Sequence, residues 1–303
     1  MNTETHQFQA EVRQLLDIVI NALYSDREIF VRELVSNASD ALEKLRLKQL
    51  TDSNIYQPDK PLEITVATDK ENKTITIADT GIGMTEADLE ENLGTIAHSG
   101  TKKFMEALKQ KQEGGADLIG QFGVGFYSSF MVADRVEVFT RSYEPEAASL
   151  RWSSDGREGY SIETLAEPLD RGTRIVIRLK DEYEEFSQEY RVKELLRRYS
   201  NFVGFPLNFN EEHINTVQAI WSKSKSDVKP EEYDEFYQFI SHTDEKPLSY
   251  MHFSADAPIA LNALLFIPRR NPEMFGFGRV DANVALYCKL SLIHISEPTR
   301  LAL

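Results

Sequence analysis

The spacing of apolar residues predicts two helices near the start of the chain. Residues 8–23 carry apolar side chains at helical spacing, and residues 25–50 do so again. Ser25 and Glu28 have the spacing of a capping box, in which side chains satisfy free backbone N–H groups of the first turn. The second helix is therefore expected to begin at this pair.

A polar stripe follows one face of the second helix. Its members come at steps of four, three and four residues: Glu33, Asn37, Asp40 and Lys44. Taken alone, these residues fit a solvated face held by ion pairs between successive turns. The motifs further along the chain decide whether this face also lines a site.

Alternation with a period of two predicts strands. Five stretches have it: residues 62–69, 74–79, 135–141, 149–153 and 173–179. The first two are expected to form a hairpin through a turn at 70–73. Asp79 shares the parity of Ile75 and Ile77, so a carboxylate ends an apolar strand face. That position is costly unless nearby groups donate hydrogen bonds to the carboxylate. Thr173 is likewise expected to end an inward-facing row.

The last third of the chain has a different organisation. Residues 180–189 are acidic and predict the start of a helix that continues to Tyr199. Residues 222–230 are rich in serine and lysine and are the best linker candidate. Apolar residues at helical spacing follow Pro230, which suits the first turn of another helix.

Length, charge and cysteine content narrow the class of protein. The 303 residues favour two domains. A net charge of −15 argues against a general partner of nucleic acid or of membrane surfaces, because both are rich in phosphate. The single cysteine excludes a disulfide framework within the chain and fits a reducing compartment. No secretory signal or long apolar run is visible, so a cytoplasmic location is expected.

Three glycine-bearing segments need an explanation. They are residues 79–83, 94–101 and 120–126, and none has the Walker or G-x-G-x-x-G pattern. Alone, the D-x-G-x-G of the first segment marks a tight turn more often than a site. Gly123 and Gly125 precede an apolar segment, where free backbone N–H groups suit a phosphate. A turn required only for packing explains those glycines equally well.

Taken together, four motifs are specific. In order, they are ELVSNASDA at 33–41, DTGIGM at 79–84, GQFGVGFYS at 120–128 and RGT at 171–173. The chain resembles the bacterial members of the heat-shock protein 90 family of molecular chaperones over about residues 7–289. That family is related to the ATPases of DNA gyrase, mismatch repair and histidine kinases. The resemblance implies an α+β fold of the Bergerat type, a two-layer α/β sandwich with helices on one face of a mixed, largely antiparallel sheet.

The resemblance also implies a division of the chain. Residues 1–215 are expected to form an ATP-binding domain with a mobile lid at about 94–125. Residues 216–289 would be a linker and the truncated start of a second α/β domain, the family's middle domain. Residues 290–303 do not continue the family pattern and resemble a scar or a frameshift, so they are left out of the fold prediction.

Four residues receive chemical roles from the resemblance. Glu33 is expected to activate the water that attacks the γ-phosphate, a task suited to a carboxylate within hydrogen-bond reach. Asn37 would be a ligand of Mg²⁺, since its oxygen is a hard donor that adds no charge. Asp79 would accept a hydrogen bond from the adenine amino group, and Thr173 would assist at the base through a water.

The resemblance places further residues around the nucleotide: Asp40, Gly83, Met84, Asn92, His98, Ser99, Gly100, Gln121, Phe122, Gly123, Val124, Gly125 and Phe126. The amides of residues 121–126 would face the phosphates. Simpler explanations exist for two of these residues. Asp40 and Lys44 fit a structural pair one turn apart equally well, and a lone methionine such as Met84 usually fills a gap in a core.

His98 stands where the family commonly has a lysine in the lid. A neutral imidazole holds phosphate less well than a cation does. We therefore expect the contribution of His98 to nucleotide affinity to strengthen as the pH falls toward about 6.5. His98→Ala should remove this contribution, as measured by the nucleotide Kd from mildly acid to alkaline pH. A flat profile in the unaltered chain, with a silent substitution, would contradict the prediction.

The function implied is that of an ATP-dependent chaperone. The chain is expected to bind Mg²⁺ with ATP or ADP, and lid closure and hydrolysis would drive the remodelling of client proteins. The full-length protein would be a homodimer. Because the arginine that the family inserts toward the γ-phosphate is absent here, hydrolysis is expected to be weak. An alternative is a nucleotide-responsive interaction module without useful catalysis. A histidine kinase or a DNA-linked relative is disfavoured, the latter by the negative charge.

Overall fold

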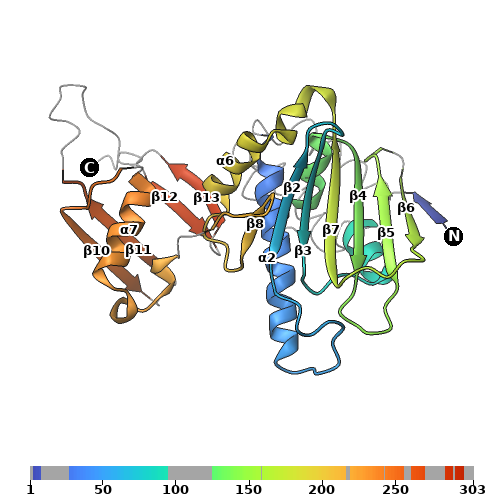
Figure 1. The fold of residues 1–303 in the computed structure, drawn as a ribbon, viewed down its shortest axis with the longest axis horizontal. Coiled ribbons are helices and arrows are strands. Elements are labelled where there is room, and N and C mark those ends of the chain that lie inside the picture. Colours follow the sequence, from blue (N-terminus) through green and yellow to red (C-terminus); the bar gives the residue numbers. More distant parts are fainter. Residues whose placement is uncertain are drawn as a thin grey trace, which may run out of the picture. The chain divides into compact units, whose positions relative to one another are not determined.

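The computed structural model describes residues 3–7, 27–94, 125–157, 159–215, 219–241, 243–255, 261–269, 284–288 and 291–296. The chain divides into two compact units, Met1–Ile214 and Asn215–Leu303. Figure 1 shows the elements of each unit along the chain. No helix in the described parts has the length and apolar character needed to cross a membrane.

The first unit is built on a nine-stranded sheet whose described strands lie in the order β1-β6-β5-β4-β7-β3-β2-β8-β9. Their bounds are β1 Thr3–Gln7, β2 Ile64–Asp69, β3 Thr74–Asp79, β4 Ala133–Arg141, β5 Ser149–Ser154, β6 Gly159–Thr164, β7 Gly172–Leu179, β8 Leu207–Phe209 and β9 Glu212–His213. Neighbouring strands are antiparallel except for β2 and β8, which run parallel. The predicted mixed, largely antiparallel sheet is confirmed.

The period-two pattern identified five of these strands. The predicted hairpin is β2 and β3, which pair from Ile64 with Asp79 to Asp69 with Thr74. The three later predictions correspond to β4, β5 and β7. The same pattern does not predict β1, which is polar throughout, or β6, where only Tyr160 and Ile162 alternate as buried apolar residues. Strands β1 and β6 are defined by their pairing with neighbouring strands. The local sequence pattern does not indicate that pairing.

Helices cover the apolar face of the sheet. They are α2 Ile29–Gln49, α3 Glu86–Leu89, η1 Glu90–Gly94, η2 Gly125–Met131, η3 Asp181–Ser187 and α6 Glu189–Tyr199. Alternate strand residues such as Ile77, Val138 and Ile177 belong to one buried cluster with residues of α2, η2 and α6. Helix α2 contacts β3 and β2, and η2 contacts β4 (Figure 1). The result is the predicted two-layer sandwich, with one apolar and one polar sheet face.

The predicted start of the second helix is wrong. Helix α2 begins at Ile29 with Glu28 as its N-cap, and no side chain among the described residues caps it. The Glu28 carboxylate instead forms an ion pair with Arg191 and accepts a hydrogen bond from Tyr199 Oη at 3.2 Å. Tertiary partners on α6 thus take the carboxylate that a capping box would use. Ser25 and the helix predicted over residues 8–23 lie outside the described residues.

The second unit contains η4 Ile220–Ser222, η5 Lys225–Asp227, α7 Pro230–Ser241 and two hairpins, β10 Ser249–Ala255 with β11 Leu261–Ile267 and β12 Val284–Cys288 with β13 Ser291–Ser296. Helix α7 begins at Pro230 as predicted. Its Tyr233 stacks on Tyr250 of β10, with ring centroids 4.1 Å apart, and shares a hydrogen bond of 2.8 Å with His252. Part of the segment left out of the fold prediction, 290–303, forms strand β13.

Candidate functional site

The polar stripe of α2 contains one enclosed carboxylate. Glu33 is only 8% exposed, whereas Asn37, Asp40 and Lys44 are exposed on later turns. In the described part of the chain, Asp40 and Lys44 form no ion pair with each other. The structural pair considered as an alternative is therefore not observed among the described residues.

The carboxylate of Glu33 lies between the side chain of Arg32 and the backbone of Gly125. Both Nη2 and Nε of Arg32 donate to Oε1, at 2.8 and 3.2 Å. Its other oxygen, Oε2, lies against Gly125 at the start of η2, where a Cβ atom would stand 2.6 Å from it. Any larger residue at 125 would displace the carboxylate. One oxygen of Glu33 therefore has fixed donors, and the other faces the beginning of a helical turn.

Asp79 ends β3 beside the start of β7, where it pairs in register with Thr173. The backbone N–H of Gly81 donates to its Oδ1 at 2.8 Å, and the backbone N–H of Thr173 also donates to the carboxylate. Burial raises the pKa of Asp79 to about 7, against the opposing effect of these donors and of Arg171. The carboxylate at the end of an apolar strand face thus has the donors that the sequence required.

The loop after Asp79 brings the strand end to the helix. The backbone N–H of Ile82 donates to the carbonyl of Ala41 on α2 at 3.1 Å. Gly81 packs against the same peptide, since a Cβ atom there would lie 2.7 Å from the carbonyl carbon of Ala41. Glu33 and Ala41 are eight residues apart on α2, or about 12 Å along the helix axis at 1.5 Å per residue. The carboxylates of Glu33 and Asp79 therefore lie beside α2 at levels about two helical turns apart.

Thr140 of β4 supports the Asp79 end and was missed by the sequence analysis. Its Oγ1 donates to the carbonyl of Gly172 at 2.9 Å, accepts from the backbone N–H of Met84 at 3.0 Å and lies 3.1 Å from Oγ1 of Thr173. The side chain is 1% exposed. A signal existed, because Thr140 continues the buried parity of Val136 and Val138 as a polar residue.

Thr140→Val is expected to destabilise the first unit by about 1–3 kcal/mol, because the buried N–H of Met84 and carbonyl of Gly172 would lose their partner. Unfolding in urea measures the change. The matched control is Thr76→Val on β3, an isosteric exchange on the less buried parity, which should stay within about 0.5 kcal/mol. Equal midpoints for both variants would contradict the role of Thr140.

The remaining predicted residues fall into two groups. Gly83 is buried with φ +64°, and a Cβ atom there would lie 1.8 Å from the carbonyl oxygen of Arg141, so its conformation and packing require glycine. Met84 is partly buried against the core, as the simpler explanation proposed. The amide of exposed Asn92 donates to the carbonyl of Asp88 at 2.8 Å. The Phe126 ring packs on Trp152 in the core.

The second group lies outside the described residues: His98, Ser99, Gly100, Gln121, Phe122, Gly123 and Val124. The lid predicted at about 94–125 is described only at its two ends. A buried bond joins these ends, since the hydroxyl of Tyr127 donates to the carbonyl of Leu93 at 3.1 Å. The roles assigned to the lid residues stay predictions.

Comparison with known proteins gives two family matches. Residues 24–173 match the family described as histidine kinase-, DNA gyrase B-, and HSP90-like ATPase. Residues 208–297 match the family described as Hsp90 protein. The chain belongs to the Hsp90 family. The second match reaches residue 297 and so includes part of the segment 290–303.

Several relatives are similar to nearly the whole chain. Chaperone protein HtpG of Desulfitobacterium hafniense is 56% identical over 291 residues, which cover 96% of this chain and 47% of that protein. HtpG of Desulfotalea psychrophila is 50% identical over 96% of this chain and 46% of its own length. The mitochondrial heat shock protein 75 kDa of Rattus norvegicus is 47% identical over 95% and 40%. The chain thus spans less than half the length of these relatives.

Proposed function

We propose that the first unit binds an adenine nucleotide with Mg²⁺ along α2 and hydrolyses ATP as the motor of an ATP-dependent chaperone. The base would lie at Asp79 and Thr173, and the terminal phosphate near Glu33. The observation that carries the proposal is the enclosed carboxylate of Asp79, which has backbone donors but remains available to a donor from a ligand. The match of residues 24–173 to an ATPase family supports it.

At the base end, the ligand must supply a hydrogen-bond donor. A carboxylate accepts hydrogen bonds only, and two backbone N–H groups already occupy part of its capacity. The exocyclic amino group of adenine is a donor of suitable size, whereas the carbonyl at the same position of guanine or hypoxanthine would face the carboxylate with a second acceptor. Thr173 pairs in register with Asp79 and donates its backbone N–H to the carboxylate, so its hydroxyl could hold a bridging water at the base.

At the phosphate end, Glu33 is suited to orient and deprotonate a water. Arg32 keeps one carboxylate oxygen in place, while the other faces the start of η2. Asn37 lies one turn further along α2, is exposed, and has no hydrogen-bond partner among the described residues, so its carbonyl oxygen fits a ligand of Mg²⁺. Mg²⁺ bound to phosphates keeps several waters and needs few protein ligands, which suits a single amide.

The wider role rests on the relatives. Two of the proteins most similar to this chain are named chaperones, which supports client proteins as partners. We extend the proposal to a homodimer of the full-length protein, acting in the cytoplasm and without nucleic acid or membrane partners. The assignments of 1–215 to nucleotide binding, 216–289 to a linker with the start of a middle domain and 290–303 to a segment outside the family pattern stay predictions.

A calorimetric titration of the purified chain with ADP and Mg²⁺ tests the proposal. Saturable binding of one ADP per chain is expected, with weaker affinity when a chelator removes Mg²⁺ because Asn37 would then lose the ion it holds. GDP serves as the control ligand, since its base presents an acceptor to Asp79. A folded chain that binds neither nucleotide, or binds GDP as well as ADP, would contradict the proposed site.

A further inference from the structure

Arg171 is a charged side chain buried to 1% exposure beside the base end of the site. It directly precedes β7, next to Gly172, whose φ of +120° and close approach to the carbonyl oxygen of Asp79 require glycine. A Cβ atom on Gly172 would stand 2.1 Å from that oxygen. The backbone at 171–172 therefore lies directly on the backbone of Asp79.

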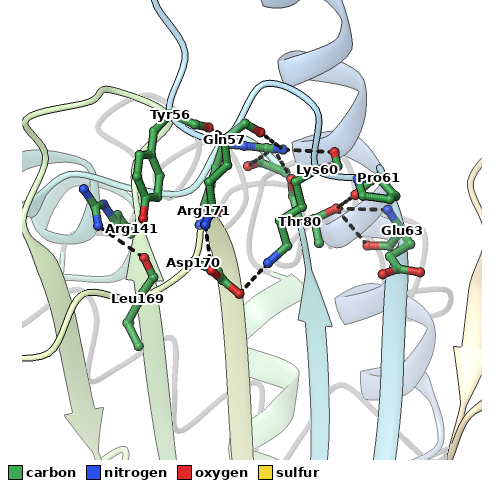
Figure 2. Close-up of polar contacts among 11 residues, drawn as sticks. Tyr56, Gln57, Lys60, Pro61, Glu63, Thr80, Arg141, Leu169, Asp170 and Arg171 are labelled. Carbon is green, nitrogen blue, oxygen red and sulfur yellow. Dashed lines mark hydrogen bonds and ion pairs between the residues drawn. The ribbon is translucent and has the colours of Figure 1, made fainter.

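The guanidinium of Arg171 donates only to backbone carbonyls within the described residues. Nε donates to Tyr56 at 3.0 Å, Nη2 to Gln57 and Lys60 at 3.2 and 3.3 Å, and Nη1 to Thr80 and, at 3.2 Å, to Gly81. Figure 2 shows the side chain between the segment around residues 56–60 and the loop at Thr80. The five N–H donors of an arginine fork thus match five acceptors.

One of these acceptors belongs to the peptide that serves Asp79. The carbonyl of Thr80 and the N–H of Gly81 are two ends of a single planar peptide group. Arg171 holds the carbonyl end, and the N–H end donates to Oδ1 of Asp79 at 2.8 Å. The orientation of that peptide therefore sets the direction of the Asp79 carboxylate, and a cation at the carbonyl end strengthens the hydrogen bond at the other end by polarisation.

The electrostatic interactions of Arg171 also connect it to Asp79. Asp170, the neighbour of Arg171, is engaged elsewhere, with Lys60 at 2.6 Å and Gln57 at 2.7 Å (Figure 2). The carboxylate that acts electrostatically on Arg171 is that of Asp79, and the positive charge in turn lowers the pKa of Asp79 against the larger effect of burial. Arg171, which has no direct carboxylate partner in the part of the chain that the structure describes, therefore stabilises the ionised form of Asp79, the residue that would recognise the base.

We propose that Arg171 is a positioning residue for adenine recognition: through the Thr80–Gly81 peptide it directs the carboxylate of Asp79 toward the base. This inference rests on the proposed nucleotide site. A merely structural arginine would tie the segment 56–60 to the loop at Thr80 with no effect on which base binds. Thr80 is already tied there by its own hydroxyl, which donates to the carbonyl of Pro61 at 2.6 Å.

The test compares Arg171→Lys with Arg141→Lys. Arg141 is a second arginine of the same region, but its guanidinium donates to the carbonyls of Leu169 and Pro145 and does not touch the Thr80–Gly81 peptide. Lysine keeps the charge and loses the fork. We expect Arg171→Lys to weaken ADP binding about tenfold and IDP binding little, so that the preference for ADP over IDP falls. Arg141→Lys should keep the preference.

Removal of the charge gives a second readout. In Arg171→Gln, the pH midpoint of adenosine binding should move upward from that of the unaltered chain, because Asp79 loses its electrostatic support. An Arg171 variant with a lower melting temperature but an unchanged ADP-to-IDP ratio and midpoint would overturn the inference. Failure of the unaltered chain to bind ADP would instead overturn the proposed function.

A measurement on the unaltered chain covers the case in which neither Arg171 variant folds. The nuclear magnetic resonance signals of the Gly81 amide and the Arg171 guanidinium should shift together when adenosine is added. Inosine, which lacks the amino group, should leave them in place at the same concentration. Guanidinium signals that stay unchanged while the Gly81 amide responds to adenosine would show that Arg171 is not coupled to the base, and the inference would fail.

Discussion

Glu33→Ala is expected to lower the rate of ATP hydrolysis by about 10²–10⁴-fold while the Kd for ADP stays near that of the unaltered chain. The carboxylate is enclosed, and its Oε2 faces the start of η2, about 12 Å along α2 from the level of the proposed base site. A group at that distance from the base contributes to the attacking water and little to the binding of a diphosphate. Single-turnover hydrolysis and calorimetry with ADP measure the two quantities separately.

Glu43→Gln is the matched control for this substitution. Glu43 lies on the same helix, with an exposed side chain that pairs with Arg46 at 2.7 Å. Its exchange should leave both hydrolysis and ADP binding unchanged. If Glu33→Ala and Glu43→Gln hydrolysed ATP at the same rate as the unaltered chain, the residual hydrolysis would not come from Glu33. The alternative of a nucleotide-responsive module without useful catalysis would then be preferred.

The sequence predicted the Asp79 end of the site from its own pattern. A carboxylate in the parity of Ile75 and Ile77 had to meet donors, and the structure supplies them from Gly81 and Thr173. Both strands of the hairpin were predicted within two residues of their observed bounds, because alternation and a turn between them are local signals. Glu33 could not be assigned to a site from its local pattern alone, since four polar residues on a helix face also fit a solvated stripe. Its role was predicted only when the four motifs were considered together.

Contacts between distant parts of the chain could not be predicted. Thr140 reaches Gly172 across 32 residues and Met84 across 56, and no local rule connects these positions. The fork of Arg171 joins segments 90 or more residues away. The start of α2 was mispredicted for the same reason, because the carboxylate of Glu28 is used by Arg191, 163 residues later. Local pattern therefore predicts the elements, and the topology decides which polar groups meet.

The pH dependence of nucleotide binding separates the two ends of the site. His98 is predicted to strengthen phosphate binding as the pH falls, whereas Asp79 must be ionised to accept from the base most strongly. Because burial raises the pKa of Asp79 to about 7, its contribution should weaken as the pH falls through that value. Adenosine has no phosphate, so its binding reports on the Asp79 end alone.

Asp79→Asn is expected to weaken ADP and adenosine binding by about 10–100-fold, because the ligand loses a charge-assisted hydrogen bond. The affinity of the unaltered chain for adenosine should rise as the pH increases through about 7 and then level off. In Asp79→Asn that rise should be absent. Calorimetry with adenosine at a series of pH values measures both effects. A variant that kept the rise would show that another group titrates.

The same substitution should stabilise the fold at alkaline pH. The pKa of Asp79 is raised from 3.8 to about 7 in the folded chain, so between these values the folded state holds more protons than the unfolded state. The carboxyl therefore lowers the free energy of unfolding as the pH rises through this window. Above pH 7, Asp79→Asn should be more stable by about 4 kcal/mol, and the difference should vanish below about pH 4.

Asp69→Asn is the control of opposite sign. Asp69 ends the neighbouring strand β2, and hydrogen bonds from the backbone and side chain of Asn72 lower its pKa. It therefore contributes stability that is present above its unfolded pKa and lost as the pH falls through the lower folded value. Asp69→Asn should reduce stability at neutral pH and leave ADP binding unchanged. If Asp79→Asn also destabilised the chain at alkaline pH, the ionised carboxylate of Asp79 would not reduce the stability of the fold. Ligand binding would then not be needed to explain its presence, and the base site would have to lie elsewhere.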